Sequence, residues 1–327
     1  MNVFMTGANG FVGLNIVSAL QAAGHHVTAF VRPGSKVTYL EPFGVNIVRG
    51  DLGNPAQVTE AMRGAEAVIH TAGNTSCYRR DLPLLSEVNV RGTQNIVAAA
   101  IENRIKRIVY TSTTSTIGAS NGKSPANEET PLTGFRARSP YAMTKLLAEK
   151  AVLAAQAQGV ECVILNPAEV VGAFDHSMQW GRMVLAVHSN QVPFIPPGGG
   201  SFCSAADVGR GHVSALTLGK SGERYILAGE NVSFSHFLDM AAKAVGKSFD
   251  VPGTRYSWVY FRALLQEKLA PLVSGKPIVE PYRIRVFGGT YYFDSSKAQE
   301  ALGYRSAPLK QMLWDCSDWY RRHRFIQ

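Results

Sequence analysis

Short apolar runs alternate with amphipathic stretches from the N-terminus to about Gly172. The short runs are rich in β-branched residues and predict strands at residues 3–6, 26–31, 45–49, 67–71, 107–112 and 161–165. Apolar positions three and four apart predict helices at residues 14–23, 55–62, 84–103 and 141–158. Strands and helices that alternate at this spacing form a parallel sheet with helices on both faces, so we expect an α/β, Rossmann-type, doubly wound fold.

The alternation fades after Gly172. Residues 193–200 are rich in proline and glycine and predict a loop. Further on, the pattern predicts helices at residues 206–218, 235–245, 256–273 and 309–322, and one strand at 224–227. We therefore expect two units: a dinucleotide-binding domain over residues 1–172, to which later segments can return, and a smaller, mostly helical substrate-binding lobe over residues 173–327.

Composition narrows the class of protein. Hydrophobic residues make up 46% of the 327 residues and charged residues 17%, which allows a sizeable core and excludes general disorder. No apolar stretch approaches the ~18–20 residues of a membrane-spanning helix, and the strand-like start lacks the features of a secretion signal. Four cysteines stand far apart, at Cys77, Cys162, Cys203 and Cys316. Dispersed cysteines favour a reducing, cytoplasmic location over a disulfide scaffold, and we predict no metal site.

The formal net charge is +9, which raises the question of a nucleic-acid partner. Lysine and arginine are scattered, and the one dense basic run, residues 321–324, lies close to the C-terminal end. The interleaved basic and aromatic residues of RNA-binding surfaces are missing from the sequence. We therefore predict no nucleic-acid partner and interpret the charge as solvated surface that can also attract an anionic ligand.

A glycine-rich loop between the first predicted strand and the first predicted helix carries the strongest functional signal. Gly7, Gly10 and Gly13 have the spacing G-x-x-G-x-x-G. In a dinucleotide-binding loop the first glycine permits a tight turn, the second lets the backbone approach a pyrophosphate, and the third allows close packing of helix and strand. The N–H groups at the start of the helix then bind the phosphates. The predicted cofactor contacts of this loop are Gly7, Asn9, Gly10, Phe11, Val12 and Gly13.

The end of the second predicted strand bears on the choice between NAD and NADP. A carboxylate there would bind the ribose 2′-hydroxyl of NAD, but the strand ends on Val31 and Arg32. Arg32 can bind a 2′-phosphate with its planar guanidinium, and Lys36 can add a second positive charge. The alternative is that Arg32 is an ordinary solvent-exposed cation. We predict NADP as the cofactor, with NAD as the second possibility.

Polar and small residues follow the next two predicted strands. Asp51, followed by Leu52, ends the third strand, where a carboxylate can accept a hydrogen bond from the adenine amino group. Thr71, Ala72 and Gly73 end the fourth strand, where small residues let a cofactor lie close to the backbone. The carboxyl ends of parallel strands meet at one edge of the sheet, so we predict that all five residues contact the cofactor.

Tyr141 and Lys145 stand four residues apart and share one face of a predicted helix. A tyrosine with its ordinary pKa near ~10 is a poor acid or base at neutral pH, but a neighbouring cation stabilises the phenolate and lowers that pKa. The fifth predicted strand runs into hydroxyl-rich residues at 110–116. We predict that Tyr141 and Lys145 act in catalysis and contact the cofactor, with a hydroxyl of this run as the third group. Asn89 is a weaker candidate, and His70 is interpreted as a core histidine.

These motifs together resemble those of a known family. The glycine spacing, the hydroxyl cluster at 111–114, Tyr141-x-x-x-Lys145 and Asn166-Pro167 are similar to those of an extended short-chain dehydrogenase/reductase of the NAD-dependent epimerase/dehydratase family. The resemblance covers nearly the whole chain. Within the family it is greatest to dihydroflavonol-4-reductase-like reductases and to hopanoid-associated epimerase-like proteins.

The resemblance implies site residues and an assembly. It places the catalytic hydroxyl on Thr113, with Ser112 as the neighbouring alternative. It implies further cofactor contacts at Thr111, Pro167, Ala168 and Val170. It also implies a homodimer that packs through the helices predicted at 84–103 and 141–158.

Three functions remain open. The first is an NADPH-dependent reductase that reduces a carbonyl group of a small hydrophobic or aromatic substrate, because Asn166-Pro167 follows the pattern of the reductase-like members. The second is a nucleotide-sugar epimerase or dehydratase that uses bound NAD(P). The third is a cofactor-sensing protein without turnover, which the intact set of Thr113, Tyr141 and Lys145 argues against. An apolar and aromatic set in the second half favours the hydrophobic substrate: Phe174, Met178, Trp180, Phe194, Phe202, Trp258, Tyr260 and Phe261.

Overall fold

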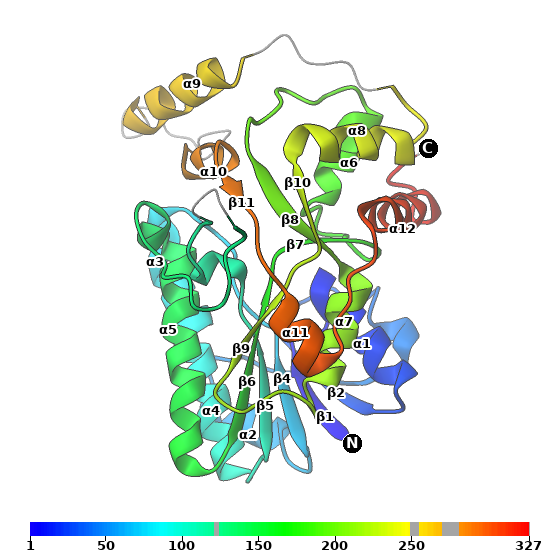
Figure 1. Cartoon of the computed structure of the whole chain (residues 1–327). Helices are drawn as coiled ribbons and strands as arrows, with labels where there is room; N and C mark the ends of the chain where they lie inside the picture. The colour runs from blue at the N-terminus through cyan, green and yellow to red at the C-terminus, as the bar shows by residue number, and fades with distance from the viewer. Residues whose placement is uncertain (121–123, 249–254, 270–280, 327) are drawn as a thin grey trace.

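A seven-stranded parallel sheet forms the centre of the molecule (Figure 1). The computed structural model describes residues 1–120, 124–248, 255–269 and 281–326. The strands follow the order β3-β2-β1-β4-β5-β6-β9, and every neighbouring pair is parallel. They are β1 (Asn2–Thr6), β2 (His26–Val31), β3 (Asn46–Arg49), β4 (Ala67–His70), β5 (Arg107–Thr111), β6 (Glu161–Pro167) and β9 (Arg224–Leu227). The strand order reverses between β1 and β4, so the predicted Rossmann-type fold is confirmed.

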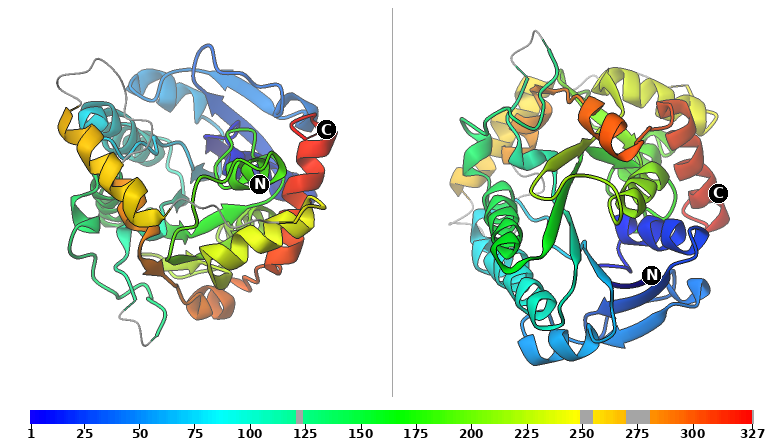
Figure 2. Two further views of the ribbon diagram at one scale, coloured as in Figure 1. Left: turned by 90° about the horizontal axis from the view of Figure 1, so that it is seen from above. Right: turned by 60° about the horizontal axis from the view of Figure 1, so that its bottom comes forward.

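Helices cover both faces of this sheet (Figure 2). One face carries α1 (Phe11–Ala22) and α7 (Ala205–Ser214), and the other carries α2 (Pro55–Ala61), α4 (Gly92–Glu102) and α5 (Pro140–Ala154). Alternate residues of β1 serve the two faces, because Met5 packs with α1 and α7 whereas Phe4 packs with the other three helices. A Cβ on Gly209 would overlap the Asn15 carbonyl oxygen, so the close approach of α7 to α1 requires glycine.

The helix predicted over residues 84–103 is interrupted. α3 (Leu82–Leu85) runs into a π-helical segment (Ser86–Arg91), and α4 begins directly after it. Within this segment the Asn89 side chain bonds the backbone of Asn74, and Thr93 Oγ1 donates to the Asn89 carbonyl oxygen at 2.6 Å. The prediction of one continuous α-helix over residues 84–103 is therefore wrong. A wider π-helical turn interrupts it, and the side-chain bonds of Asn89 and Thr93 lie at this turn. Such π segments frequently lie at functional sites.

A second, smaller sheet lies beyond the carboxyl ends of the first (Figure 1). Its order is β10-β8-β11, and β7 also pairs with β8. The strands are β7 (Glu169–Val171), β8 (Gly199–Ser204), β10 (Glu230–Ser233) and β11 (Thr290–Tyr291). The predicted loop over 193–200 therefore ends before Gly199. The helices α6 (Gly181–His188), α8 (Phe234–Ala244) and α12 (Leu309–Arg322) share an apolar core beside this sheet.

Segments after residue 172 return to the first sheet. β9 pairs with β6, α7 packs on α1, and α11 (Ser296–Leu302) lies against β9. A domain boundary at residue 172 stays a prediction.

Two more helices, α9 (Tyr256–Leu269) and α10 (Pro281–Phe287), lie at the upper left in Figure 1. Residues 270–273 of the predicted helix 256–273 lie outside the described residues. A search of the described helices found none with the length and apolar character needed to cross a membrane.

Candidate active site

The predicted phosphate loop closes tightly against the start of α1. Gly7 has a φ of +71°, and a Cβ on it would lie 2.6 Å from the backbone nitrogen of Ala72. A Cβ on Gly13 would overlap the Gly7 carbonyl oxygen, so both positions require glycine. The first turn of α1 holds no acidic residue and no side-chain cap. Its uncapped N–H groups and the positive end of the helix fit the pyrophosphate of a dinucleotide.

Three cations surround the loop that follows β2. Arg32 and Lys36 are exposed, and neither forms an ion pair with another described residue. Asn9 Nδ2 donates to the Lys36 carbonyl oxygen at 3.3 Å, which joins this loop to the phosphate loop. Arg49, at the end of β3, donates to the Ser35 carbonyl oxygen at 3.2 Å. Sequence reasoning missed Arg49, although its place at the end of the strand beside β2 was a usable signal.

Asp51 and Leu52 follow β3 at the same edge of the sheet. The Asp51 N–H donates to Gln57 Oε1, and Asp51 Oδ1 accepts from the Gly53 N–H, each at 2.9 Å. These bonds stabilise the turn while the Asp51 side chain remains exposed. Contact of this carboxylate with an adenine stays a prediction.

Hydroxyl groups join the ends of β4 and β5. Thr71 Oγ1 lies 2.8 Å from Thr111 Oγ1, which also lies 2.8 Å from His212 Nε2 on α7. The Ala72 N–H donates to Thr6 Oγ1 at 3.2 Å, which ties the backbone before Gly73 to β1. The Thr111 hydroxyl is therefore used inside the fold, and its cofactor contact, like those of residues 71–73, stays a prediction.

Helix α5 carries Tyr141 and Lys145 on its first two turns, after the Ser139 side chain caps it. Lys145 is 3% exposed. Its Nζ donates to the Thr111 carbonyl oxygen at 2.7 Å and lies 4.1 Å from the centroid of the Tyr110 ring. The ammonium is thus held at the carboxyl end of β5.

Burial determines the acidity of both groups. It raises the pKa of Tyr141 above its ordinary value of 10, while the neighbouring Thr113 side chain opposes the rise. It lowers the pKa of Lys145 to about 7, against the opposing charge of Glu149. The net pKa of Tyr141 is therefore raised rather than lowered, because desolvation dominates and the Lys145 ammonium is directed at a carbonyl of β5. A lowering of the Tyr141 pKa by Lys145 stays a prediction. Tyr141 is a protonated phenol and can act as a proton donor.

A network beneath the turn after β5 orients Thr113. The Ser112 hydroxyl donates to buried Glu149, which directs it away from Tyr141. Asn166 Nδ2 donates to the Thr113 carbonyl oxygen at 3.0 Å. The Thr113 hydroxyl donates to Ser115 Oγ at 3.2 Å, and the Thr113 side chain lies close enough to Tyr141 to oppose the rise of its pKa. This geometry supports Thr113 over Ser112 as the hydroxyl beside the phenol. Sequence reasoning missed Glu149, which stands one helical turn after Lys145.

Asn89 connects the loop after β4 to α5. Its Oδ1 accepts from the Asn74 N–H at 2.7 Å, and its Nδ2 donates to the Asn74 carbonyl oxygen at 3.0 Å and to Thr144 Oγ1 at 3.1 Å. All its polar atoms are used within the fold, which indicates a positioning role. His70 is fully buried between two threonine hydroxyls, and burial lowers its pKa to about 3. It is a neutral core histidine.

Aromatic residues and an arginine border the site on the side of the second sheet. Tyr282 of α10 lies close to the side chain of Ser139, two residues before Tyr141. The Arg136 guanidinium lies 4.4 Å from the centroid of the Tyr291 ring. The predicted nicotinamide contacts Pro167 and Ala168 lie at the end of β6 and directly after it, and Val170, a further predicted cofactor contact, lies in β7. These contacts stay predictions. The rings of Tyr282 and Tyr291 thus lie beside Arg136 and Ser139, which precede α5.

The aromatic residues that the sequence suggested for a substrate pocket lie in two other environments, the core and the exposed surface. The Trp180 ring centroid lies 4.9 Å from that of Phe202 and 5.6 Å from that of Phe234, so these rings form core. Trp258 and Phe261 are exposed on α9. These residues therefore do not support a hydrophobic substrate, and Tyr282 and Tyr291 are the aromatic residues that do.

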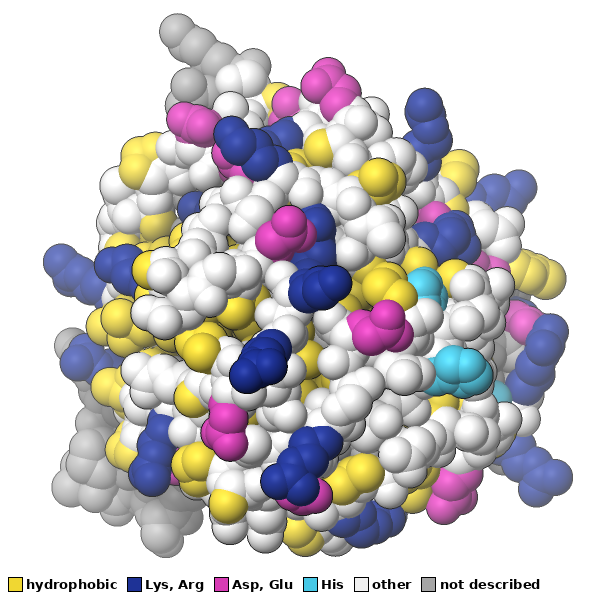
Figure 3. Space-filling model, turned by 90° about the horizontal axis from the view of Figure 1, so that it is seen from below, with side chains coloured by type: hydrophobic (Ala, Val, Ile, Leu, Met, Phe, Trp, Pro, Cys, Tyr) yellow, Lys and Arg dark blue, Asp and Glu magenta, His cyan; other side chains and the backbone are white. Residues whose placement is uncertain are grey.

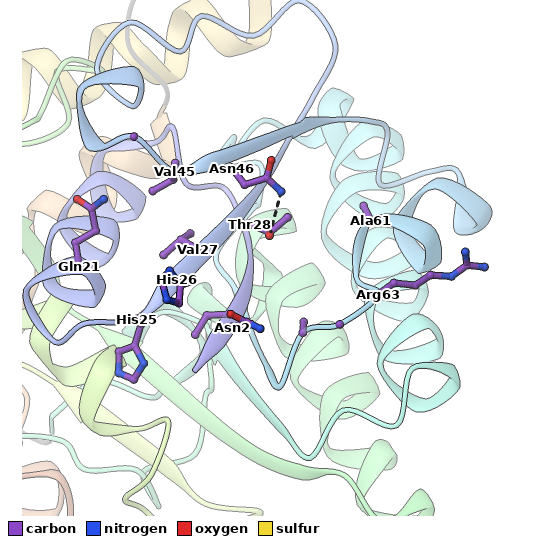
Figure 4. A pocket seen from close by; sticks show the side chains of 14 residues that line it. Asn2, Gln21, His25, His26, Val27, Thr28, Val45, Asn46, Ala61 and Arg63 are labelled. Atoms are coloured by element: carbon purple, nitrogen blue, oxygen red, sulfur yellow. Dashed lines mark hydrogen bonds between the residues drawn. The ribbon is translucent and has the colours of Figure 1, made fainter.

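A pocket at the opposite end of the strands is separate from this site (Figure 4). It is lined by residues around the amino ends of β1 to β3, among them Asn2, His26, Thr28 and Asn46. Because the phosphate loop lies at the carboxyl ends, this pocket has no part in the candidate site. On the face seen from below, basic and acidic side chains are interspersed rather than gathered by sign (Figure 3).

The thiols of Cys162, Cys203 and Cys316 are buried. Within the described residues, no group of three or more histidine, cysteine, aspartate or glutamate side chains could hold a metal ion. The absence of a metal from the protein stays a prediction.

The sheet, the glycine loop and the Tyr141–Lys145 helix define an NAD(P)-dependent class of enzyme, and comparison with known proteins agrees. A sequence profile of the NAD dependent epimerase/dehydratase family matches residues 3–228. The chain therefore belongs to this family and is an NAD(P)-dependent enzyme of the extended short-chain dehydrogenase/reductase type.

Similar proteins match along nearly the whole chain. A protein named putative dihydroflavonol 4-reductase from Synechocystis sp. is 31% identical, over 99% of this chain and 96% of that protein. Sterol demethylase protein B of Methylococcus capsulatus is 29% identical, with 100% of both chains covered. The crystal structure of gox2253 matches with a TM-score of 0.87 at 30% identity, over 99% of both chains. These similarities confirm the predicted family and enzyme class.

Proposed function

We propose that the protein is an NADPH-dependent reductase that reduces a carbonyl group of a small hydrophobic or aromatic substrate. The observation that carries the proposal is the place of the Thr113 side chain beside Tyr141, a protonated phenol on the helix that also carries the buried Lys145. Similarity to a protein named as a reductase supports the direction of the reaction. The tyrosines of α10 and β11 beside the site support an aromatic or apolar substrate.

The chain's own residues would act as follows. When bound, NADPH supplies the hydride that a carbonyl carbon accepts. Thr113 orients the carbonyl oxygen by a hydrogen bond, and Tyr141 donates its phenolic proton to the oxygen as negative charge develops there. Lys145, with a pKa of about 7, stands one helical turn away, where it can stabilise the phenolate that remains.

The cofactor preference rests on charge. Arg32, Lys36 and Arg49 surround the loop after β2, where an NADP-specific enzyme binds the 2′-phosphate. No carboxylate ends β2, so the group that would favour the ribose diol of NAD is missing from this strand. The proposed phosphate contacts are Arg32 and Lys36, with Arg49 as an addition from the structure.

We also infer a homodimer through α3 and α5. Leu84, Met143 and Leu147 are 54%, 44% and 49% exposed, and all three lie within the helical regions that the family resemblance implies for the interface. Large exposed apolar side chains on neighbouring helices mark contact surfaces.

We also propose a cytoplasmic location, because the four cysteines are dispersed along the sequence and such cysteines favour a reducing compartment.

The discriminating experiment measures oxidation of NADPH and NADH by the purified protein with aldehydes, ketones and nucleotide sugars. A reductase consumes added NADPH in proportion to a carbonyl substrate. A nucleotide-sugar epimerase instead retains its dinucleotide through purification and interconverts sugars without added cofactor. The second result would replace the proposed function.

A further inference from the structure

Helix α9 presents large apolar side chains to solvent. Trp258, Phe261, Leu264 and Leu265 are 63%, 58%, 36% and 47% exposed. At 100° per residue, positions 258, 261 and 265 fall on one stripe, and position 264 lies at its edge. Single exposed apolar side chains are normal on a protein surface, but four large ones on one face of a helix form a patch that indicates a contact surface.

The opposite face of α9 already holds the helix to the protein. Ala263 is 3% exposed, and Tyr256 Oη donates to the Ile284 carbonyl oxygen on α10 at 2.7 Å. The Tyr256 ring centroid lies 6.0 Å from that of Phe194. Among the described residues, the packing contacts of α9 therefore lie on the face opposite the stripe, and the stripe requires a different explanation.

Charge beside the stripe indicates what covers it. Arg255 and Arg262 are exposed, and they stand three residues before and four residues after Trp258, on the same edge of the helix. Neither forms an ion pair with another described residue. An apolar stripe with tryptophan and phenylalanine, bordered by arginine, is the arrangement of a helix that lies in the interface of an anionic bilayer. We propose that the outward face of α9 docks on an anionic lipid surface.

A second copy of the chain fits this face less well. A two-fold contact through α9 would bring Arg255 and Arg262 of both copies together in a partly apolar interface, which like-charge repulsion opposes. The proposed dimer surface on α3 and α5 is separate and has its own exposed leucines. A lipid surface uses both the apolar stripe and the charge.

Docking would also orient the candidate active site. Helix α9 packs on α10, and Tyr282 of α10 lies close to the side chain of Ser139, two residues before Tyr141. The site would then face a source of apolar substrate. This consequence rests on the proposed function, whereas docking itself does not.

The test is flotation of the full-length protein with vesicles of phosphatidylcholine, with and without phosphatidylglycerol. We expect the wild type to float with the anionic vesicles. The double variant Trp258→Ser, Phe261→Ser should bind these vesicles at least about tenfold more weakly, because each substitution removes apolar surface that docking would bury. The double variant Arg255→Glu, Arg262→Glu should also lose binding, and added salt should weaken the wild type. Trp314→Ser is the matched control, since Trp314 is 54% exposed on α12.

The outcomes separate the occupants. A blue shift of tryptophan fluorescence on vesicle addition, present in Trp314→Ser and absent in Trp258→Ser, would support insertion of α9. Absence of flotation by a folded wild type, or equal flotation of wild type and the α9 apolar variant, would overturn the proposal. So would sedimentation in which the α9 variants convert a dimer to a monomer, because the stripe would then be covered by a second copy. None of these three results affects the NADPH oxidation assay of the proposed function.

Discussion

Glu149 Oε1 accepts a hydrogen bond from Asn166 Nδ2 at 3.0 Å, which joins the catalytic helix candidate α5 to the end of β6. Glu149 is 2% exposed, and the same oxygen accepts from Thr116 Oγ1 at 2.8 Å. Since Asn166 Nδ2 also donates to the Thr113 carbonyl oxygen, a single buried carboxylate orients the turn beneath Thr113. The same carboxylate raises the pKa of Lys145 against the larger effect of burial.

Glu149→Gln should therefore shift the pH profile of turnover. The substitution keeps the shape and removes the charge, so the pKa of Lys145 falls below about 7 and the corresponding limb of the kcat profile moves to lower pH. Glu161→Gln, at an exposed carboxylate, is the control and should leave the profile in place. A Glu149 variant with a lowered melting temperature and an unchanged pH profile would limit Glu149 to a structural role.

Tyr141→Phe should abolish turnover and leave cofactor affinity nearly unchanged, because only the proton donor is lost. General acids contribute on the order of a hundredfold or more to rate. Steady-state kinetics and fluorescence titration with NADPH measure the two effects. Thr113→Ser, which keeps the hydroxyl, should retain much more activity than Thr113→Val. Activity of Tyr141→Phe above about a tenth of the wild type would show that another group supplies the proton.

Arg32 should confer a preference for NADPH over NADH of at least about tenfold in Kd, because one charge-assisted bond contributes on the order of 1.5–3 kcal/mol before solvent screening. Arg32→Asp should reverse the preference by repelling the 2′-phosphate and accepting a ribose hydroxyl. Dissociation constants for both cofactors, at low and raised salt, measure this. Arg63→Asp, at the opposite end of the sheet, is the control. Equal wild-type constants would mean that Arg32 faces solvent only.

Leu147→Asp should convert the proposed dimer to a monomer, because it places a charge in an apolar contact between copies of α5. Leu218→Asp is matched in exposure, at 48% against 49%, and should leave the assembly intact. Analytical ultracentrifugation at micromolar concentration distinguishes the two states. A wild-type protein that sediments only as a monomer would end the dimer proposal.

Acid should destabilise the fold through two buried histidines. Burial lowers the pKa of His70 to about 3 and that of His212 to about 4, from an ordinary 6.5. The unfolded chain therefore binds protons below pH 6.5 that the folded chain does not, so the free energy of unfolding decreases as pH falls through this range. Between pH 7 and 5 each histidine should cost on the order of 2 kcal/mol. Urea unfolding at both pH values measures the loss, and equal stabilities would contradict the neutral, buried assignment.

Much of the first sheet could be predicted from the sequence, because strand alternation and glycine spacing are local properties of the chain. The runs at 26–31 and 224–227 are strands with the bounds expected. The phosphate loop follows from Gly7 and Gly13, whose surroundings leave no room for a Cβ. Local sequence patterns were therefore sufficient to predict both the fold class and the position of the cofactor loop.

The remaining features depend on contacts between distant residues. The π-helical segment at Asn89 accompanies side-chain bonds that include Asn74, fifteen positions away in sequence. In the small sheet, β8 pairs with strands from three separate segments of the chain, β7, β10 and β11. None of these three segments shows a strong strand pattern in the sequence alone.

The sequence by itself determined which groups are present: a phenol and an ammonium one helical turn apart, after a glycine loop and a hydroxyl-rich strand end. Only the tertiary structure decided their protonation and orientation. Whether Tyr141 is a phenol or a phenolate depends on how completely the fold removes water from it, and whether Lys145 turns to it or to a carbonyl depends on what packs alongside. Desolvation arises from every surrounding segment at once, so no local pattern in the chain encodes it.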